Sequence, residues 1–119
     1  MDFQNAPVTV SQIPEGFKVT FLGAIHTNTS WIERELDKVT AASPKVVDLD
    51  LTGTEHISSL GLGILVGFNN RIKKSGGVVK VVAIKRRTLG ILKVAFLDKL
   101  FTITPDAVVD DPAKQPSKT

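Results

Sequence analysis

The sequence predicts an α/β fold in which a mostly parallel sheet has an antiparallel edge strand and carries its helices on one face. Short β-branched segments alternate along the chain with segments whose apolar residues recur every three or four positions. The first two strand-like segments follow each other across a turn, whereas each later one follows a helical segment. Because strand–helix–strand connections are right-handed crossovers, the later strands are expected to run parallel.

The antiparallel edge is predicted from the first two strand-like segments. Residues 8–10 and 17–22 alternate apolar and polar side chains, as half-buried strands do. Pro14 and Gly16 lie between them and are typical of a tight turn. The pattern therefore predicts a β-hairpin, which ends at Gly23.

A helix is predicted next, and Pro44 ends it because proline cannot continue a helix. Thr29 and Ser30 both offer N-cap hydroxyls, and Ser30 with Glu33 has the spacing of a capping box. The stripe expected to face the sheet consists of Ile32, Leu36 and Val39.

Two strand–helix units and a last short strand follow. Strands are predicted at 46–51, 78–84 and 100–103, and helices at about 60–74 and 87–97. Gly76 and Gly77 end the second of the three helices because glycine tolerates positive φ. The third helix is expected to carry Leu89, Leu92 and Phe96 on one face. The apolar stripes of all three helices are expected to cover the same face of the sheet.

The chain is expected to form one domain. Its 119 residues suffice for one domain and are too few for two ordinary ones. We place the domain at residues 1–104. Residues 105–119 are rich in Pro, Asp, Lys and Ser without an apolar period, which predicts a flexible C-terminal tail.

The chain offers few residues for catalysis. It has no cysteine and only two histidines, His26 and His56, and nothing resembles a metal-ligand cluster. Asp48 and Asp50 would share one face of a strand, where paired carboxylates could act in acid–base work or bind a divalent ion. The interpretation we favour is structural, with both on the solvated face of the sheet. We therefore expect no enzyme activity, no cofactor and no metal.

Three further features limit the classes of protein. Gly61 and Gly63 lack the third glycine of a dinucleotide fingerprint and the lysine of a phosphate loop. Residues 1–7 have neither the basic start nor the apolar core of a signal peptide. Charges interrupt every apolar run before it could cross a bilayer. We therefore expect a cytoplasmic protein without membrane insertion.

Positive charge gathers in the second half of the chain. Nine basic residues stand between Arg71 and Lys99 against a single acid, Asp98. Such a region could face nucleic acid, an anionic membrane or an acidic protein surface. Because only one aromatic residue, Phe96, stands among these charges, we favour a solvated face and expect no nucleic acid as partner.

The segment that stands out is 58–65, Ser-Ser-Leu-Gly-Leu-Gly-Ile-Leu, between a predicted central strand and a helix. A serine there can accept a hydrogen bond from a first-turn backbone N–H, and the glycines would let the helix start approach another backbone closely. The ordinary interpretation is thus an N-cap and a tightly packed helix. The functional one starts from the positive end of the helix dipole, which would tolerate a phosphate on such a serine.

Residues 57–63 resemble the central motif of STAS domains, the anti-sigma factor antagonists. The resemblance extends through 47–51, 72–77, 81–84 and 97–101, and so covers most of the chain up to about Thr104. It implies the STAS fold, which agrees with the element order predicted from periodicity alone.

The resemblance also implies site residues. Ser59 occupies the place of the phosphorylated serine, and Ser58 stands where many members have aspartate. His26, in the loop after Gly23, replaces another acid of the family. The implied partner-binding residues are Ser58, Ser59, Leu60, Gly61, His26 and Thr27. The final amphipathic helix common in the family is not evident after Pro105.

The mechanism implied by the resemblance is a partner switch. The unphosphorylated domain, a monomer or weak dimer, would bind an anti-sigma factor that is also a serine kinase, and so release the sigma factor for transcription. Phosphorylation of Ser59 with the partner's ATP would separate the complex, and a serine phosphatase would reset it. Two alternatives remain open: a non-catalytic STAS adaptor subunit of a stressosome-like shell or lipid-transport ABC system, and a small-ligand or nucleic-acid binder that uses the basic half.

Overall fold

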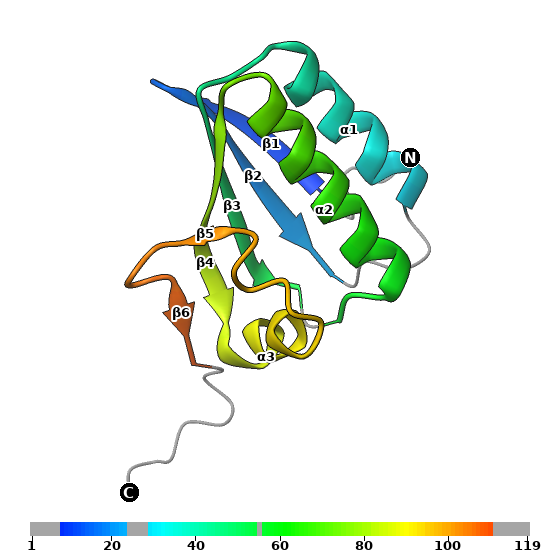
Figure 1. Ribbon diagram of the computed structural model, residues 1–119, viewed down its shortest axis with the longest axis vertical. Coiled ribbons are helices and arrows are strands. Elements are labelled where there is room, and N and C mark those ends of the chain that lie inside the picture. The colour runs from blue at the N-terminus through cyan, green and yellow to red at the C-terminus, as the bar shows by residue number, and fades with distance from the viewer. Residues whose placement is uncertain (1–7, 24–28, 55, 111–119) are drawn as a thin grey trace, which may run out of the picture.

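The computed structural model describes residues 8–23, 29–54 and 56–110. Strands and helices alternate in it after an initial hairpin (Figure 1). The elements are β1 (Val8–Ile13), β2 (Gly16–Leu22), α1 (Thr29–Ala41), β3 (Val46–Gly53), α2 (Ser59–Lys74), β4 (Val78–Lys85), α3 (Arg86–Val94), β5 (Thr102–Ile103) and β6 (Val108–Val109).

One mixed sheet joins the strands in the order β1-β2-β3-β4-β5. β1 pairs antiparallel with β2, and every other pairing is parallel. The predicted fold class, a mostly parallel sheet with an antiparallel edge, is therefore confirmed.

The sheet extends beyond the predicted last strand. β6 pairs in parallel with the end of β4, where Ile84 lies opposite Val108. Ala107 is fully buried, and its carbonyl oxygen accepts a 2.9 Å hydrogen bond from the Ile84 N–H. The predicted start of a flexible tail at residue 105 is thus too early, because Val108 and Val109 still pair with β4 as part of the sheet. Residues 111–119 lie outside the described part of the chain.

Alternate residues of the central strands form the core. Val19, Leu49 and Val81 are among the side chains with no exposed surface, and they share one face of β2, β3 and β4. The stripe predicted for α1 packs on this face, since Ile32 and Leu36 are fully buried and Val39 nearly so. Burial of such aliphatic side chains supplies about 1.5–3 kcal/mol each and holds the helices on the sheet.

The opposite face of the sheet carries polar side chains along its middle. Lys18, Asp48 and Lys80 lie side by side across β2, β3 and β4, and each is partly exposed. Two residues further along β3, the Asp50 carboxylate accepts hydrogen bonds from the Thr52 N–H and hydroxyl at 3.0 and 2.6 Å. The two carboxylates thus have the structural place that the sequence favoured.

α1 and α2 lie side by side over the apolar face, while α3 lies at the end of the sheet where the parallel strands stop (Figure 1). The predicted N-cap at Thr29 or Ser30 is wrong, because both residues are already helical. α2 also starts at this end of the sheet, so its first turn and α3 share one end of the molecule. Across the described residues no helix combines the length and apolarity needed to cross a membrane.

Candidate functional site

Ser58 is the N-cap of α2. Its backbone is extended, with φ −75° and ψ 170°, and its hydroxyl oxygen accepts a 3.1 Å hydrogen bond from the Gly61 N–H. Its carbonyl oxygen accepts the first intrahelical bond, from the Leu62 N–H at 2.9 Å. The first of the two serines therefore satisfies a helix-end donor that would otherwise have no partner.

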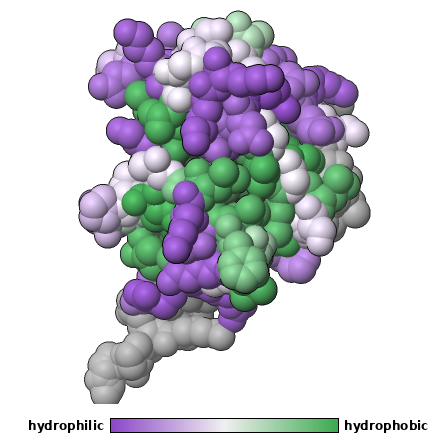
Figure 2. Space-filling view, viewed as in Figure 1, coloured by the Kyte–Doolittle hydropathy of each residue, from purple (hydrophilic) through white to green (hydrophobic). Residues whose placement is uncertain are grey.

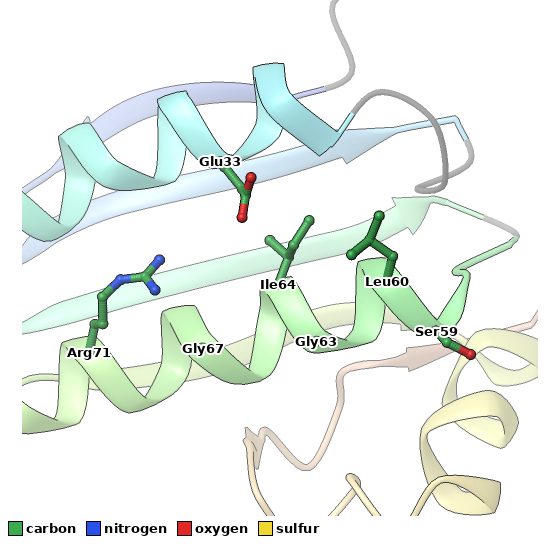
Figure 3. A pocket seen from close by; sticks show the side chains of 7 residues that line it. All are labelled: Glu33, Ser59, Leu60, Gly63, Ile64, Gly67 and Arg71. Carbon is green, nitrogen blue, oxygen red and sulfur yellow. The ribbon is translucent and has the colours of Figure 1, made fainter.

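Ser59 has a different environment. It is the first residue of α2, it is exposed, and its side chain makes no hydrogen bond to a residue that the structure describes. Figure 3 shows its hydroxyl pointing off the end of the helix, away from the other labelled side chains. The two adjacent serines thus divide the roles: Ser58 stabilises the helix and Ser59 presents a hydroxyl to solvent.

The start of α2 favours negative charge. Its first turn contains no acidic residue that would compensate the positive end of the helix dipole. The first backbone N–H groups of a helix also lack intrahelical acceptors, so they can donate to an oxyanion. A phosphate on the Ser59 hydroxyl would therefore meet a favourable electrostatic environment without entering the core.

A groove runs from Ser59 along the surface between α1 and α2 (Figure 3). Its volume is about 270 Å³, and it is lined by Glu33, Ser59, Leu60, Gly63, Ile64, Gly67 and Arg71. At its far end the Arg71 guanidinium lies 3.6 Å from the Asp37 carboxylate, which joins the two helices. Leu60, at the end near Ser59, is 59% exposed.

The glycines of this groove do not serve the purpose that the sequence suggested. A Cβ on Gly63 would meet no atom within 4 Å, so no backbone approaches closely there, and the expected tight packing is wrong at this position. A Cβ on Gly67 would meet only the Arg71 guanidinium, at 3.4 Å. The fold does not require either glycine. Gly63 leaves open space beside the first turn of α2, whereas the Arg71 side chain lies over Gly67.

Not every predicted site residue belongs to the described part of the chain. His26 and Thr27 lie outside the described residues. Gly61 is a buried residue of the first turn of α2 and can contribute only its backbone. Within the described ranges no group of three or more His, Cys, Asp or Glu side chains could hold a metal ion.

The sequence pattern predicts the wrong environment for one exposed residue, Phe96. Phe96 was expected on the buried face of the third helix, but α3 ends at Val94 and Phe96 is 86% exposed. Val94 is 81% exposed. The true buried face of α3 consists of Thr88, Leu89 and Leu92. The prediction failed because α3 ends at Val94, and the i, i+3, i+7 spacing of Leu89, Leu92 and Phe96 does not show where the helix ends.

The chain matches the model of the STAS domain family over residues 12–109. Among solved structures it is similar to an anti-sigma factor antagonist from Mycobacterium paratuberculosis, with 28% sequence identity and a TM-score of 0.73. That match covers 82% of this chain and 84% of the other.

Two more distant structures share the fold. An anti-sigma-factor antagonist (STAS) domain protein from Planctomyces limnophilus is 21% identical, with a TM-score of 0.62 over 82% of this chain and 87% of the other. The phosphorylated form of SpoIIAA, a Bacillus cell fate determinant, is 10% identical, with a TM-score of 0.63 over 92% of this chain and 96% of the other.

Proposed function

The chain belongs to the STAS domain family, and we propose that it is an anti-sigma factor antagonist whose binding to its partner is switched by phosphorylation of Ser59. The observation that carries the proposal is the separation of two roles at the start of α2. Ser58 caps the helix, so the exposed Ser59 hydroxyl can be modified without loss of a structural hydrogen bond.

The partner is an anti-sigma factor that is also a serine kinase. In the unphosphorylated state it covers the start of α2, with the exposed Leu60 side chain as an apolar contact next to Ser59. The open space at Gly63 lets a partner's side chain reach the helix backbone. Occupation of the kinase by this chain releases the sigma factor for transcription.

The switch is an electrostatic change at one atom. The kinase transfers the γ-phosphoryl group of its ATP to the Ser59 Oγ: the bond to ADP breaks, the Oγ–P bond forms, and the hydroxyl proton leaves to a base of the kinase. The product carries about −2 charges where the hydroxyl was neutral. A dianion inside an interface must be desolvated or paired, and each 1.4 kcal/mol of penalty weakens binding by about tenfold. No refolding is needed.

The remaining components come from outside this chain. ATP belongs to the kinase, so this chain needs no cofactor and performs no catalysis of its own. A serine phosphatase removes the phosphate and restores binding. The cycle runs in the cytoplasm, where a sigma factor acts.

The test uses the purified anti-sigma factor kinases of the source genome, one at a time, with ATP and the full chain. Mass mapping of the product is expected to find one phosphate on Ser59. Ser59→Ala is expected to bind the kinase but remain unmodified, whereas Ser58→Ala is expected to be modified. Modification of Ser58 in place of Ser59, or no binding to any of these kinases, would overturn the proposal.

A second candidate is a STAS adaptor that is never phosphorylated, as in a stressosome-like shell or a lipid-transport ABC system. The observation that favours it is Ser58, which stands where many family members carry an aspartate. In that case the start of α2 is the contact surface but no kinase acts on it. A neighbouring transporter ATPase gene and stable binding of Ser59→Asp to its product would support the adaptor over the switch.

A further inference from the structure

In the described chain each of the three helices is followed, two residues after its last residue, by a residue in the left-handed conformation. These residues are Ser43 after α1, with φ 48°, Gly76 after α2, with φ 92°, and Phe96 after α3, with φ 61°. Glycine is favoured at such a position because it has no Cβ, whereas a bulky side chain there is an outlier. Phe96 is thus the unusual member of the set.

The ends of α2 and α3 have the same hydrogen-bond pattern. In α2 the Gly77 N–H donates to the Ile72 carbonyl at 2.9 Å and the Gly76 N–H to the Lys73 carbonyl at 3.0 Å. In α3 the Leu97 N–H donates to the Leu92 carbonyl at 2.8 Å. The Phe96 N–H donates to the Lys93 carbonyl at 3.0 Å. Both are Schellman motifs, in which Phe96 and Gly76 hold equivalent positions.

The domain gains no packing from the Phe96 ring. The residue is 86% exposed, and Val94, two residues earlier, is 81% exposed. When an aromatic side chain in a strained backbone position does not pack within its own domain, it is expected to contribute to binding another molecule. We call Phe96 and Val94 together the α3 anchor.

Most charged residues near the α3 anchor in the sequence are basic, and Asp98 is the one acid among them. Arg87, Lys93 and Lys99 are exposed and form no ion pair with a described residue. Arg86, by contrast, is paired with Asp110, with 2.6 Å between Nε and Oδ1. Exposed apolar side chains near free cations are complementary to an apolar pocket bordered by carboxylates.

The surface around the α3 anchor continues toward Ser59. Figure 2 shows hydrophobic residues gathered over the part of this face that holds the start of α2 and α3, while hydrophilic residues cover the far halves of α1 and α2. One protein surface can therefore cover the start of α2 and α3 together. A bilayer, being flat and fluid, has no pocket that would select a single ring presented from a fixed backbone position.

We propose that the α3 anchor inserts into an apolar pocket with an acidic border on the protein that also covers Ser59, and that Phe96 is a main determinant of its affinity. The inference rests on the proposed function for the identity of that protein, but the anchor itself can be tested without it. Exposed aromatic residues that become fully desolvated in an interface are frequent hot spots.

The first experiment identifies what contacts the ring. Benzoylphenylalanine is placed at position 96 of the full chain in its native cells, and at position 43 as a control in the same backbone conformation at the other end of the molecule. Illumination is expected to link position 96, but not position 43, to one protein, which is then identified by mass spectrometry. A link to lipid or to a second copy of this chain, or no link at all, would overturn the proposal.

The second experiment measures affinity for that purified protein. Phe96→Gly is expected to bind at least about tenfold more weakly than the unsubstituted chain, while Ser43→Gly stays within about twofold. The thermal midpoint of Phe96→Gly is expected to be no lower than that of the unsubstituted chain. A lowered midpoint would mean that the ring supports the fold, and unchanged affinity would mean that it is not an anchor; either result refutes the inference.

These results also separate the two proposals. If the linked protein is not an anti-sigma factor kinase and Phe96→Gly weakens its binding, the anchor stands and the proposed function fails. If the linked protein is such a kinase and Phe96→Gly binds it normally, the proposed function stands and the anchor fails.

Discussion

The Ser58 hydroxyl oxygen accepts a 3.1 Å hydrogen bond from the Gly61 backbone N–H, and this bond fixes the start of the helix that presents Ser59. The cap and the candidate phosphorylation site are adjacent in sequence but separate in function. Substitutions at Ser58 are therefore expected to change the stability of the domain, and substitutions at Ser59 are expected to change partner binding.

Ser58→Ala is expected to lower the free energy of unfolding by about 1 kcal/mol, because it removes the cap of α2. Ser59→Ala is expected to change it by less than about 0.5 kcal/mol, since the exposed hydroxyl makes no bond within the described chain. Urea unfolding of both variants measures the difference. Equal losses would show that the two serines share the capping role.

Ser59→Asp is expected to leave the fold intact and to weaken partner binding by about tenfold or more. A carboxylate at the positive end of α2, whose first turn has no acid, is expected to raise the free energy of unfolding by about 0.3–1 kcal/mol. Ser59→Asn, similar in size but neutral, is the matched control and is expected to retain most of the affinity. If Asn and Asp weaken binding equally, size and not charge is responsible.

Gly63→Ala is expected to stabilise the domain and to weaken partner binding. The added methyl group meets no atom within 4 Å, and alanine favours a helix interior over glycine by about 0.5–1 kcal/mol. The same methyl group would fill part of the groove beside Ser59. Thermal unfolding and a binding titration measure the two effects. A variant that is more stable and binds normally would show that the partner does not reach this open space.

Thr88→Val is expected to lower the free energy of unfolding by about 1–3 kcal/mol. The buried Thr88 hydroxyl donates a 2.8 Å hydrogen bond to the Thr54 carbonyl, which ties the start of α3 to the end of β3, and its loss leaves a buried acceptor unpaired. Thr104→Val is the control, because its 3.4 Å bond to the Val81 carbonyl is longer and only partly buried. Urea unfolding is expected to rank Thr88→Val as the more damaging change.

The element order could be predicted because it depends on local periodicity. The hairpin, the parallel strands and the stripe of α1 each follow from side chains two, three or four positions apart, and the structure confirms them. Residues 107–109 were missed for the opposite reason. A two-residue strand has no period of its own, and its place is determined by pairing with β4, more than twenty residues earlier.

Phe96 shows how a correct spacing can mislead. Leu89, Leu92 and Phe96 have helical spacing, but the chain leaves the helix after Val94, since the Phe96 and Leu97 N–H groups bond back to carbonyls of the last turn. The turn reverses the direction of the chain and carries the ring out of the core. A sequence pattern contains no information on this reversal when phenylalanine replaces the usual glycine.

By itself the sequence determined the fold class, the order of most elements and the segment at which a partner is expected to act, because hydrophobic periods and a short motif are local properties. Only the tertiary structure decided which serine caps α2, which glycines face open space and which aromatic ring remains outside the core. Those outcomes depend on backbone dihedral angles at single residues and on contacts between distant segments. Neither is specified until the whole chain has packed.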